Sequence, residues 1–154
     1  MPATRWKPNV TVAAVIERDG RFLLVEERSG GRLLLNQPAG HLEARESLCD
    51  AIRREVREET GYGFEPRALV GIFRYPSPER SVTYLRFCFA GHATATPQAP
   101  IPDTAIAGLV WLDADELAAA RERHRSPLVW RAVAEYRAGR RCDLGLLHDV
   151  SPGS

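Results

Sequence analysis

The chain has 154 residues and a formal net charge of +1, with 21 basic residues against 20 acidic ones. This balance excludes a strongly charged surface for nucleic acid or an anionic membrane, and no apolar run approaches the ~18 residues of a membrane span. The cysteines are three in number and lack Cys-x-x-Cys spacing, which indicates reduced thiols rather than a disulfide framework. We expect one cytoplasmic domain over residues 1–154, a monomer or homodimer that acts on a small molecule.

Hydrophobic periodicity and turn residues predict alternating strands and helices along the chain. In chain order they predict strands over residues 9–17, 21–27 and 33–35, a helix over 47–60, strands over 67–75, 81–90 and 105–112, and two further helices that begin after Asp113 and Ser126. A loop with three prolines spans residues 94–103, and the tail from about residue 142 shows no period and stays unassigned. Strands dominate, so we expect an α/β sandwich.

The helix over residues 47–60 has clear start and stop signals. Ser47, with Asp50 three residues later, resembles a capping box, and Gly61 supplies the left-handed residue that ends many helices. On a helical wheel, an apolar stripe that includes Ile52 and Val56 lies beside an acidic face.

The acidic face of this helix is unfavourable for the helix itself. Glu55, Glu58 and Glu59 are spaced i, i+3 and i+4, where like charges cost about 0.2–0.5 kcal/mol per pair. Two of them lie in the last turn, where the helix dipole disfavours anions. Two interpretations stay open from these residues alone: a solvated surface laced with Arg–Glu pairs, or a site for a hard divalent cation, which prefers oxygen ligands.

The segment over residues 40–62 resembles the signature box of the Nudix hydrolases, G-x5-E-x7-R-E-U-x-E-E-x-G-U, where U is a bulky apolar residue. The chain fills this box with Gly40, Glu46, Arg54, Glu55, Val56, Glu58, Glu59 and Gly61. The one departure is Tyr62, where the family usually carries an aliphatic residue, and this change concerns packing rather than chemistry. The resemblance implies the Nudix fold, a mixed β-sheet between α-helices.

The resemblance also implies site roles. Glu55, Glu58 and Glu59 are expected to ligate Mg²⁺, with Mn²⁺ as a possible substitute, and Gly40 to offer its backbone carbonyl. Arg54 is expected to orient the acids, and Glu46 to fix the loop to the helix. The implied reaction is hydrolysis of a phosphoanhydride bond by a metal-activated water, whose proton passes to Glu58 or to a loop acid such as Asp103.

Four residues outside the box are candidates for contacts with substrate. Arg86 and Tyr84 share one face of a predicted strand, where a guanidinium and a ring could hold a phosphate and stack a heterocycle. The alternative is that this face is solvated, or that Arg86 pairs with an acid. Asn36 and Gln37 precede the box, where side-chain amides could meet polar groups of the substrate.

Similarity beyond the box points to one branch of the family. The segments WKPNVTVAAVIERDGRFLLVEE, LNQPAGHLEA and RSPLV resemble the NudJ-type phosphatases, which act on thiamine pyrophosphate, on its pyrimidine pyrophosphate precursor and on nucleoside di- and triphosphates. Hydrolysis of ADP-ribose or of dinucleoside polyphosphates is the alternative within the family. A Nudix domain that binds a nucleotide as a sensor, without turnover, is the alternative from another class.

Overall fold

The computed structural model describes residues 3–153, which form two β-sheets and the helices that flank them. The strands are β1 (Asn9–Val15), β2 (Glu17–Arg18), β3 (Arg21–Ser29), β4 (Arg32–Asn36), β5 (Ala39–His41), β6 (Phe64–Ser77), β7 (Val82–Ala93) and β8 (Ile106–Leu112). The helices are α1 (Leu48–Thr60), α2 (Ala114–Ala119) and α3 (Leu128–Arg137), with short 3₁₀ turns η1 (Arg121–Arg123) and η2 (Leu144–Leu146). None of the described helices is long and apolar enough to span a membrane.

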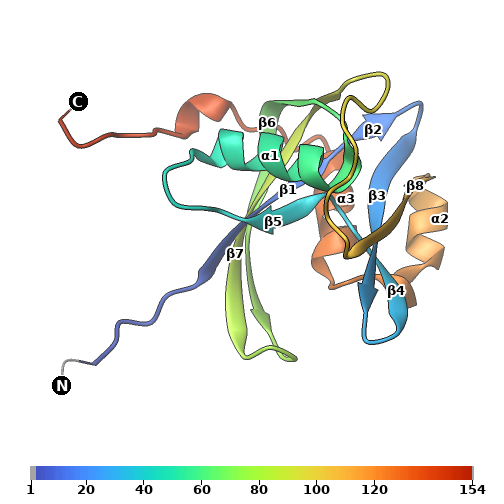
Figure 1. Ribbon diagram of the computed structural model, residues 1–154, viewed down its shortest axis with the longest axis horizontal. Coiled ribbons are helices and arrows are strands. Elements are labelled where there is room, and N and C mark those ends of the chain that lie inside the picture. Colours follow the sequence, from blue (N-terminus) through green and yellow to red (C-terminus); the bar gives the residue numbers. More distant parts are fainter. Residues whose placement is uncertain (1–2, 154) are drawn as a thin grey trace.

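The larger sheet is mixed and has the order β5-β1-β7-β6. In it β1 pairs in parallel with β7, whereas the β1–β5 and β6–β7 pairs are antiparallel. The smaller sheet joins β3 to β2, β4 and β8, all antiparallel. Figure 1 shows the paired strands β6 and β7 projecting as a long hairpin beyond the rest of the larger sheet.

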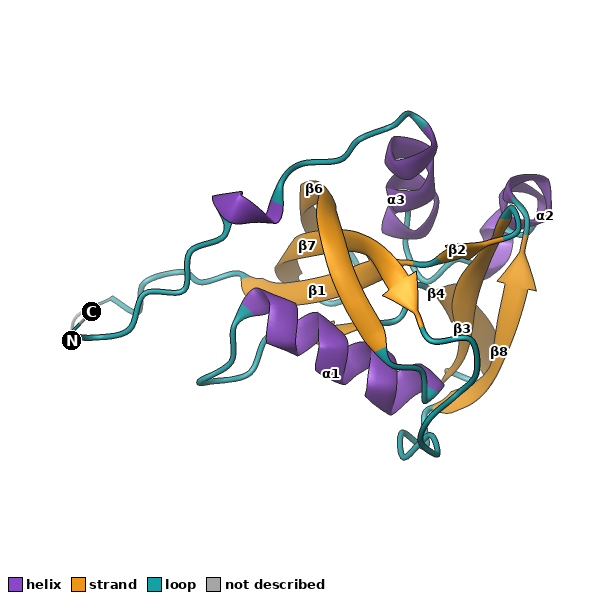
Figure 2. Ribbon diagram, turned by 90° about the horizontal axis from the view of Figure 1, so that it is seen from above, coloured by secondary structure: helices purple, strands orange, loops and turns teal. Residues whose placement is uncertain are grey.

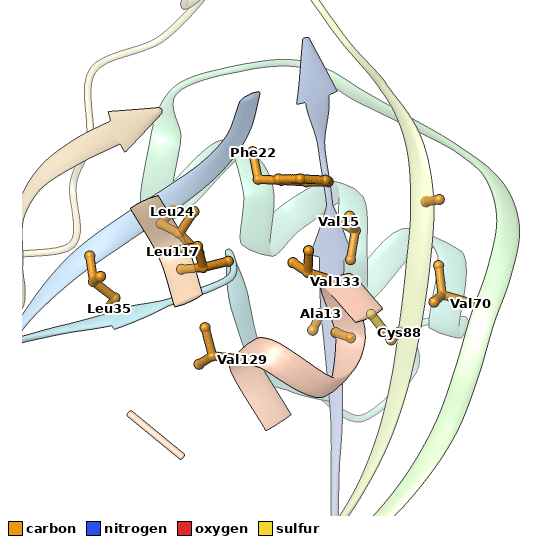
Figure 3. Close-up of a cluster of buried hydrophobic side chains, with 12 residues drawn as sticks. Ala13, Val15, Phe22, Leu24, Leu35, Val70, Cys88, Leu117, Val129 and Val133 are labelled. Atoms are coloured by element: carbon orange, nitrogen blue, oxygen red, sulfur yellow. The ribbon is translucent and has the colours of Figure 1, made fainter. Parts of the chain in front are cut away.

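Two cores form on opposite faces of the larger sheet, because side chains alternate along β1. Ala13 and Val15 pack in the cluster that holds the apolar face of α3, while Val12 and Ala14 pack in the cluster that holds α1. Figure 2 shows α1 and α3 on either side of this sheet, and Figure 3 shows the α3-side cluster. The predicted fold class, a mixed sheet between helices, is therefore confirmed, with the difference that the strands divide into two sheets.

Helix α1 begins and ends as its sequence predicts. The Ser47 hydroxyl accepts a hydrogen bond from the Asp50 N–H at 3.0 Å, and Gly61 adopts φ +75° while its N–H bonds to the Arg57 carbonyl. Ile52 and Val56 are fully buried beneath it. This anchoring fixes which face of α1 presents its acids to the neighbouring strand β5.

The sequence predicts no strand between residues 35 and 47, so the presence of strand β5 is a correction. Ala39, Gly40 and His41 pair with β1 at the edge of the larger sheet. Three residues carry too little periodicity to be recognised in a sequence, and their pairing partner lies far away along the chain. Because β5 is a strand, its backbone lies in a fixed position alongside α1.

Candidate active site

Arg54 of α1 is the centre of an acidic cluster. Its guanidinium donates to both carboxylate oxygens of Glu46, at 2.9 and 2.7 Å, and to Glu55 at 2.7 Å. It also reaches Glu58 at 3.2 Å and the His41 carbonyl at 2.9 Å. These bonds, led by those to Glu46, raise the pKa of Arg54, so the guanidinium stays charged and holds the box loop, strand β5 and helix α1 together.

Glu46 contacts the loop as well as the helix. It accepts a hydrogen bond from the Glu43 N–H at 2.7 Å in addition to the paired bonds from Arg54. The Arg54 hydrogen bonds lower the pKa of Glu46, so its carboxyl is ionised at neutral pH. This is the position in which the box resemblance places a loop-fixing acid.

Glu59 is the most buried acid of the box, at 4% exposure. One carboxylate oxygen accepts a hydrogen bond from the Ala39 N–H at 2.6 Å. Burial raises the pKa of Glu59 to about 9, and the nearby charges of Glu27, Glu55 and Asp103 act in the same direction. Glu59 is therefore a buried acid among other acids. A cation bound nearby would favour the ionised form of Glu59.

Gly40 lies directly against Glu55. A Cβ atom at residue 40 would lie 2.1 Å from both Cδ and Oε1 of Glu55, so only glycine leaves this carboxylate its place beside the β5 backbone. Burial raises the pKa of Glu55, although Arg54 opposes the shift. Glu58 is more open than its neighbours, with 46% of its side chain exposed.

The donor set of these residues suits a hard divalent cation, because it consists of carboxylate and backbone oxygens around a buried acid that lacks a cationic partner within hydrogen-bond distance. The arrangement differs from the expected one in a single respect. Arg54 holds Glu55 and Glu58 as expected, but within residues 3–153 no group of three or more His, Cys, Asp or Glu side chains converges as a ligand set.

A cavity of about 880 Å³ opens beside this cluster, on the α3 side of the larger sheet. It extends from Gly40 and His41 of β5 to the tip of the β6–β7 hairpin and to the start of α3. Positive charge and aromatic rings dominate its lining. The arginines are Arg74, Arg80, Arg86, Arg121, Arg125 and Arg131, the acids are Glu27 and Glu79, and the aromatic residues are Phe73, Tyr75, Tyr84 and Trp130.

Arg86 lies on the floor of the cavity at 8% exposure. Burial lowers the pKa of its guanidinium, and no acid of the described chain lies within ion-pair distance. Arg86 therefore makes no ion pair with an acid of the described chain, and its contact with substrate stays a prediction. Tyr84 lines the same cavity, with its ring centroid 6.4 Å from that of His41.

Asn36 also lines the cavity, whereas Gln37 does not. The Asn36 side-chain N–H donates to Glu27 at 3.2 Å. Gln37 is 1% exposed and donates to the Val129 carbonyl of α3 at 2.7 Å, so it turns away from the cavity and joins strand and helix. The prediction of a substrate contact by Gln37 is therefore corrected to a packing role.

Two further acids bear on the site. The sequence did not point to Glu27, because it lies among the charged residues that end β3, where an acid is usually solvated. Burial raises the pKa of Glu27, and the Arg125 guanidinium lies 3.8 Å from its carboxylate. Asp103 does not line the cavity, and its carboxylate accepts from the Ala105 N–H at 2.9 Å. Its charge nevertheless acts on both Glu27 and Glu59, which places it near the acidic cluster.

Comparisons with known proteins agree with this geometry. The family model for the NUDIX domain matches residues 6–131. The phosphatase NudJ of Escherichia coli K12 is 39% identical over 146 residues, which cover 95% of this chain and 94% of that protein.

Solved structures show the same fold. A NUDIX hydrolase from Nitrosomonas europaea superposes with a TM-score of 0.90 at 46% identity, covering 96% of this chain and 100% of that one. A bifunctional NMN adenylyltransferase/ADP ribose pyrophosphatase from Francisella tularensis shares the fold alone, with a TM-score of 0.73 at 19% identity over 89% of this chain and 43% of that one. The chain belongs to the Nudix family and is a Nudix hydrolase.

Proposed function

We propose that this Nudix hydrolase cleaves a phosphoanhydride bond of a nucleoside di- or triphosphate, or of a thiamine-type pyrophosphate, in a Mg²⁺-dependent reaction. The observation that carries the proposal is the continuity of two features. A cavity with six arginines and four aromatic residues opens onto Gly40 and His41, and the carboxylate of Glu55 lies against Gly40. Such a lining suits a ligand that combines several phosphate charges with a planar ring.

The box residues would hold the cation. Glu55, Glu58 and Glu59 supply carboxylate oxygens and Gly40 a backbone carbonyl, while Arg54 keeps the acids in position. A divalent cation bound there neutralises phosphate charge and acidifies a water molecule; Mn²⁺ is the natural substitute for Mg²⁺.

The remaining chemistry falls to the chain's own side chains. The arginines at the mouth of the cavity bind and orient the phosphates, so that attack occurs in line with the leaving group. A carboxylate accepts the proton of the attacking water. Two acids are suited to this step: Glu58, which is partly exposed beside Arg54, and Asp103, whose charge reaches Glu59. Asp103→Asn separates them, because Asp103 is not among the proposed metal ligands. If Asp103 is the base, this variant lowers kcat by about 100-fold or more, whereas an unchanged kcat leaves the step to Glu58.

The substrate is tested by following phosphate release from a panel with and without Mg²⁺. The panel contains thiamine pyrophosphate, nucleoside di- and triphosphates, ADP-ribose and dinucleoside polyphosphates. Release of one inorganic phosphate per turnover supports the proposal, in line with the similarity to the phosphatase NudJ. Two monophosphate products would instead support the ADP-ribose or dinucleoside polyphosphate reaction. Pyrophosphate released from a nucleoside triphosphate would indicate another branch of the family. Tight binding without turnover of any compound would support a sensor.

A further inference from the structure

Three buried side chains on the cavity floor present polar atoms without a hydrogen-bond partner in the described chain. These atoms are the Thr11 hydroxyl oxygen, the Asn36 side-chain carbonyl oxygen, and Nε and Nη1 of Arg86. The three residues are 4%, 6% and 8% exposed, and all of them line the cavity. Unpaired buried polar groups destabilise a folded protein, so a cluster of them at one place requires an explanation.

Strand register brings two of these residues together. Thr11 of β1 lies opposite His41 of β5 on one side and opposite Arg86 of β7 on the other. Arg86 in turn lies opposite Phe73 of β6. The four residues therefore form one row across the larger sheet, all facing the cavity, and the hydroxyl and the guanidinium are neighbours in it.

Asn36 reaches the cavity from the smaller sheet. Its side-chain N–H donates to Glu27, and its side-chain carbonyl oxygen is buried without a hydrogen-bond partner in the described chain. The cavity floor thus offers donors from Arg86, an acceptor from Asn36, and the Thr11 hydroxyl, which can do either. The carboxylate of Glu27 adds a further acceptor beside Asn36.

This combination does not suit a phosphate group. Phosphate oxygens only accept hydrogen bonds, so they would leave the Asn36 oxygen unpaired, and the Glu27 carboxylate would repel them. The cavity has other groups for phosphates, namely the exposed arginines Arg74, Arg80, Arg121 and Arg131. The floor and the mouth of the cavity therefore fit chemically different parts of one ligand.

We propose that Thr11, Asn36 and Arg86 form a receptor for the polar edge of a flat heterocycle in the substrate, an edge with a hydrogen-bond acceptor beside an N–H or NH₂ donor. Arg86 donates to the acceptor, and the Asn36 oxygen accepts from the donor. The Thr11 hydroxyl completes the set, and Phe73 lies next to Arg86 where a ring can pack. This receptor rests on the proposed function, since it selects among substrates of the same site.

The test uses binding of product-like probes, which needs no turnover. The probes are the four common nucleoside monophosphates and thiamine monophosphate, with ribose 5-phosphate and inorganic pyrophosphate as probes without a heterocycle, each measured by calorimetry. Thr11→Val removes the hydroxyl at nearly constant volume. We expect it to weaken the best-bound heterocyclic probe about 3- to 10-fold, to leave pyrophosphate binding unchanged, and to raise the Tm of the free protein. Thr11→Ser should restore binding.

Two more variants make the result specific. Arg86→Lys keeps the charge but loses the guanidinium geometry, so it should weaken the heterocyclic probe about 10-fold or more and pyrophosphate far less. Thr94→Val is the matched control: that hydroxyl accepts from the Gly63 N–H and donates to the Thr96 carbonyl, so its loss should lower Tm and leave binding unchanged.

Three outcomes would overturn the receptor. The first is that Thr11→Val or Arg86→Lys weakens pyrophosphate and nucleotide binding equally, which would make the floor a phosphate site. The second is a fall in Tm for Thr11→Val. The third is failure of every heterocyclic probe to bind the wild-type protein. Failure of the proposed function is a separate result, namely normal probe binding without hydrolysis of any compound.

Discussion

Glu59→Gln tests whether the buried acid of the box is held ready for a cation. Glu59 has an ordinary pKa of 4.5 that its surroundings raise to about 9, chiefly through burial. Between pH 4.5 and about 9, the Glu59 carboxyl has lost its proton in the unfolded chain but keeps it in the folded chain. The stability of the metal-free protein therefore falls as pH rises. Each pH unit corresponds to about 1.4 kcal/mol, so the loss between pH 4.5 and 7.5 is at most about 4 kcal/mol.

Glutamine reproduces the protonated form of Glu59 at every pH. In Glu59→Gln this part of the pH dependence should therefore disappear, and the variant should be more stable than the wild type near pH 8 without metal. A loss of about 4 kcal/mol corresponds to roughly 8–16 °C in Tm for a domain of this size. Glu27 and Glu55 also have raised pKa values, so a smaller slope of the same sign remains.

The assay is thermal unfolding in chelator and in saturating Mg²⁺ at several pH values between about 5 and 9. Mg²⁺ should stabilise the wild type most at high pH, by about 2.7 kcal/mol at 100 times its Kd, and should stabilise Glu59→Gln much less. The exposed acid Glu122 supplies the control, since Glu122→Gln should behave as the wild type. Identical pH profiles for the wild type and Glu59→Gln, or equal Mg²⁺ stabilisation, would show that Glu59 is not a buried acid held ready for a cation.

Three further substitutions follow from the same contacts. Gly40→Ala places a methyl group where the Glu55 carboxylate lies, so kcat/KM should fall about 10- to 100-fold while Tm changes little, because a flexible side chain gives way. Arg54→Gln frees the acids that the guanidinium holds, and steady-state kinetics should show a loss of about 10- to 100-fold that added Mg²⁺ only partly recovers. Gln37→Leu removes the hydrogen bond that Gln37 donates to the Val129 carbonyl and should lower stability by about 0.5–1.5 kcal/mol in urea unfolding, with kcat unchanged.

Each of these results has a contrary outcome. Gly108→Ala is the matched glycine control, because its Cβ would lie 3.5 Å from the nearest atom, an ordinary contact. If Gly40→Ala lowers activity no more than Gly108→Ala does, the close approach at Glu55 has no catalytic importance. Wild-type kinetics for Arg54→Gln would remove its positioning role. A large loss of kcat without loss of stability in Gln37→Leu would return Gln37 to the substrate site.

Local signals predicted most of the helix that carries the box. The cap at Ser47, the stop at Gly61 and the apolar stripe through Ile52 and Val56 all depend on neighbouring residues, so the sequence was sufficient for them. Alternation along the β7 strand likewise predicted that Arg86 and Tyr84 share one face, and both side chains line the cavity.

Features that depend on distant partners could not be predicted in the same way. Gln37 turns toward Val129, which lies 92 residues further along the chain, and no local pattern shows which of two adjacent amides faces a cavity. Thr11 was overlooked because a threonine among valines is typical of a strand, and its unpaired hydroxyl appears only once β1 lies beside β7. Glu27 was overlooked for a similar reason, since its burial is set by packing around the cavity.

The most direct test of the account is the turnover of Glu58→Gln and Glu59→Gln on the best substrate of the panel, at saturating Mg²⁺ and with the released phosphate measured. Each variant should lose about 100-fold or more in kcat relative to the wild type, and chelator should abolish the activity of the wild type. Wild-type turnover by both variants, or full activity of the wild type in chelator, would contradict the assignment of these glutamates to a metal-dependent hydrolase site.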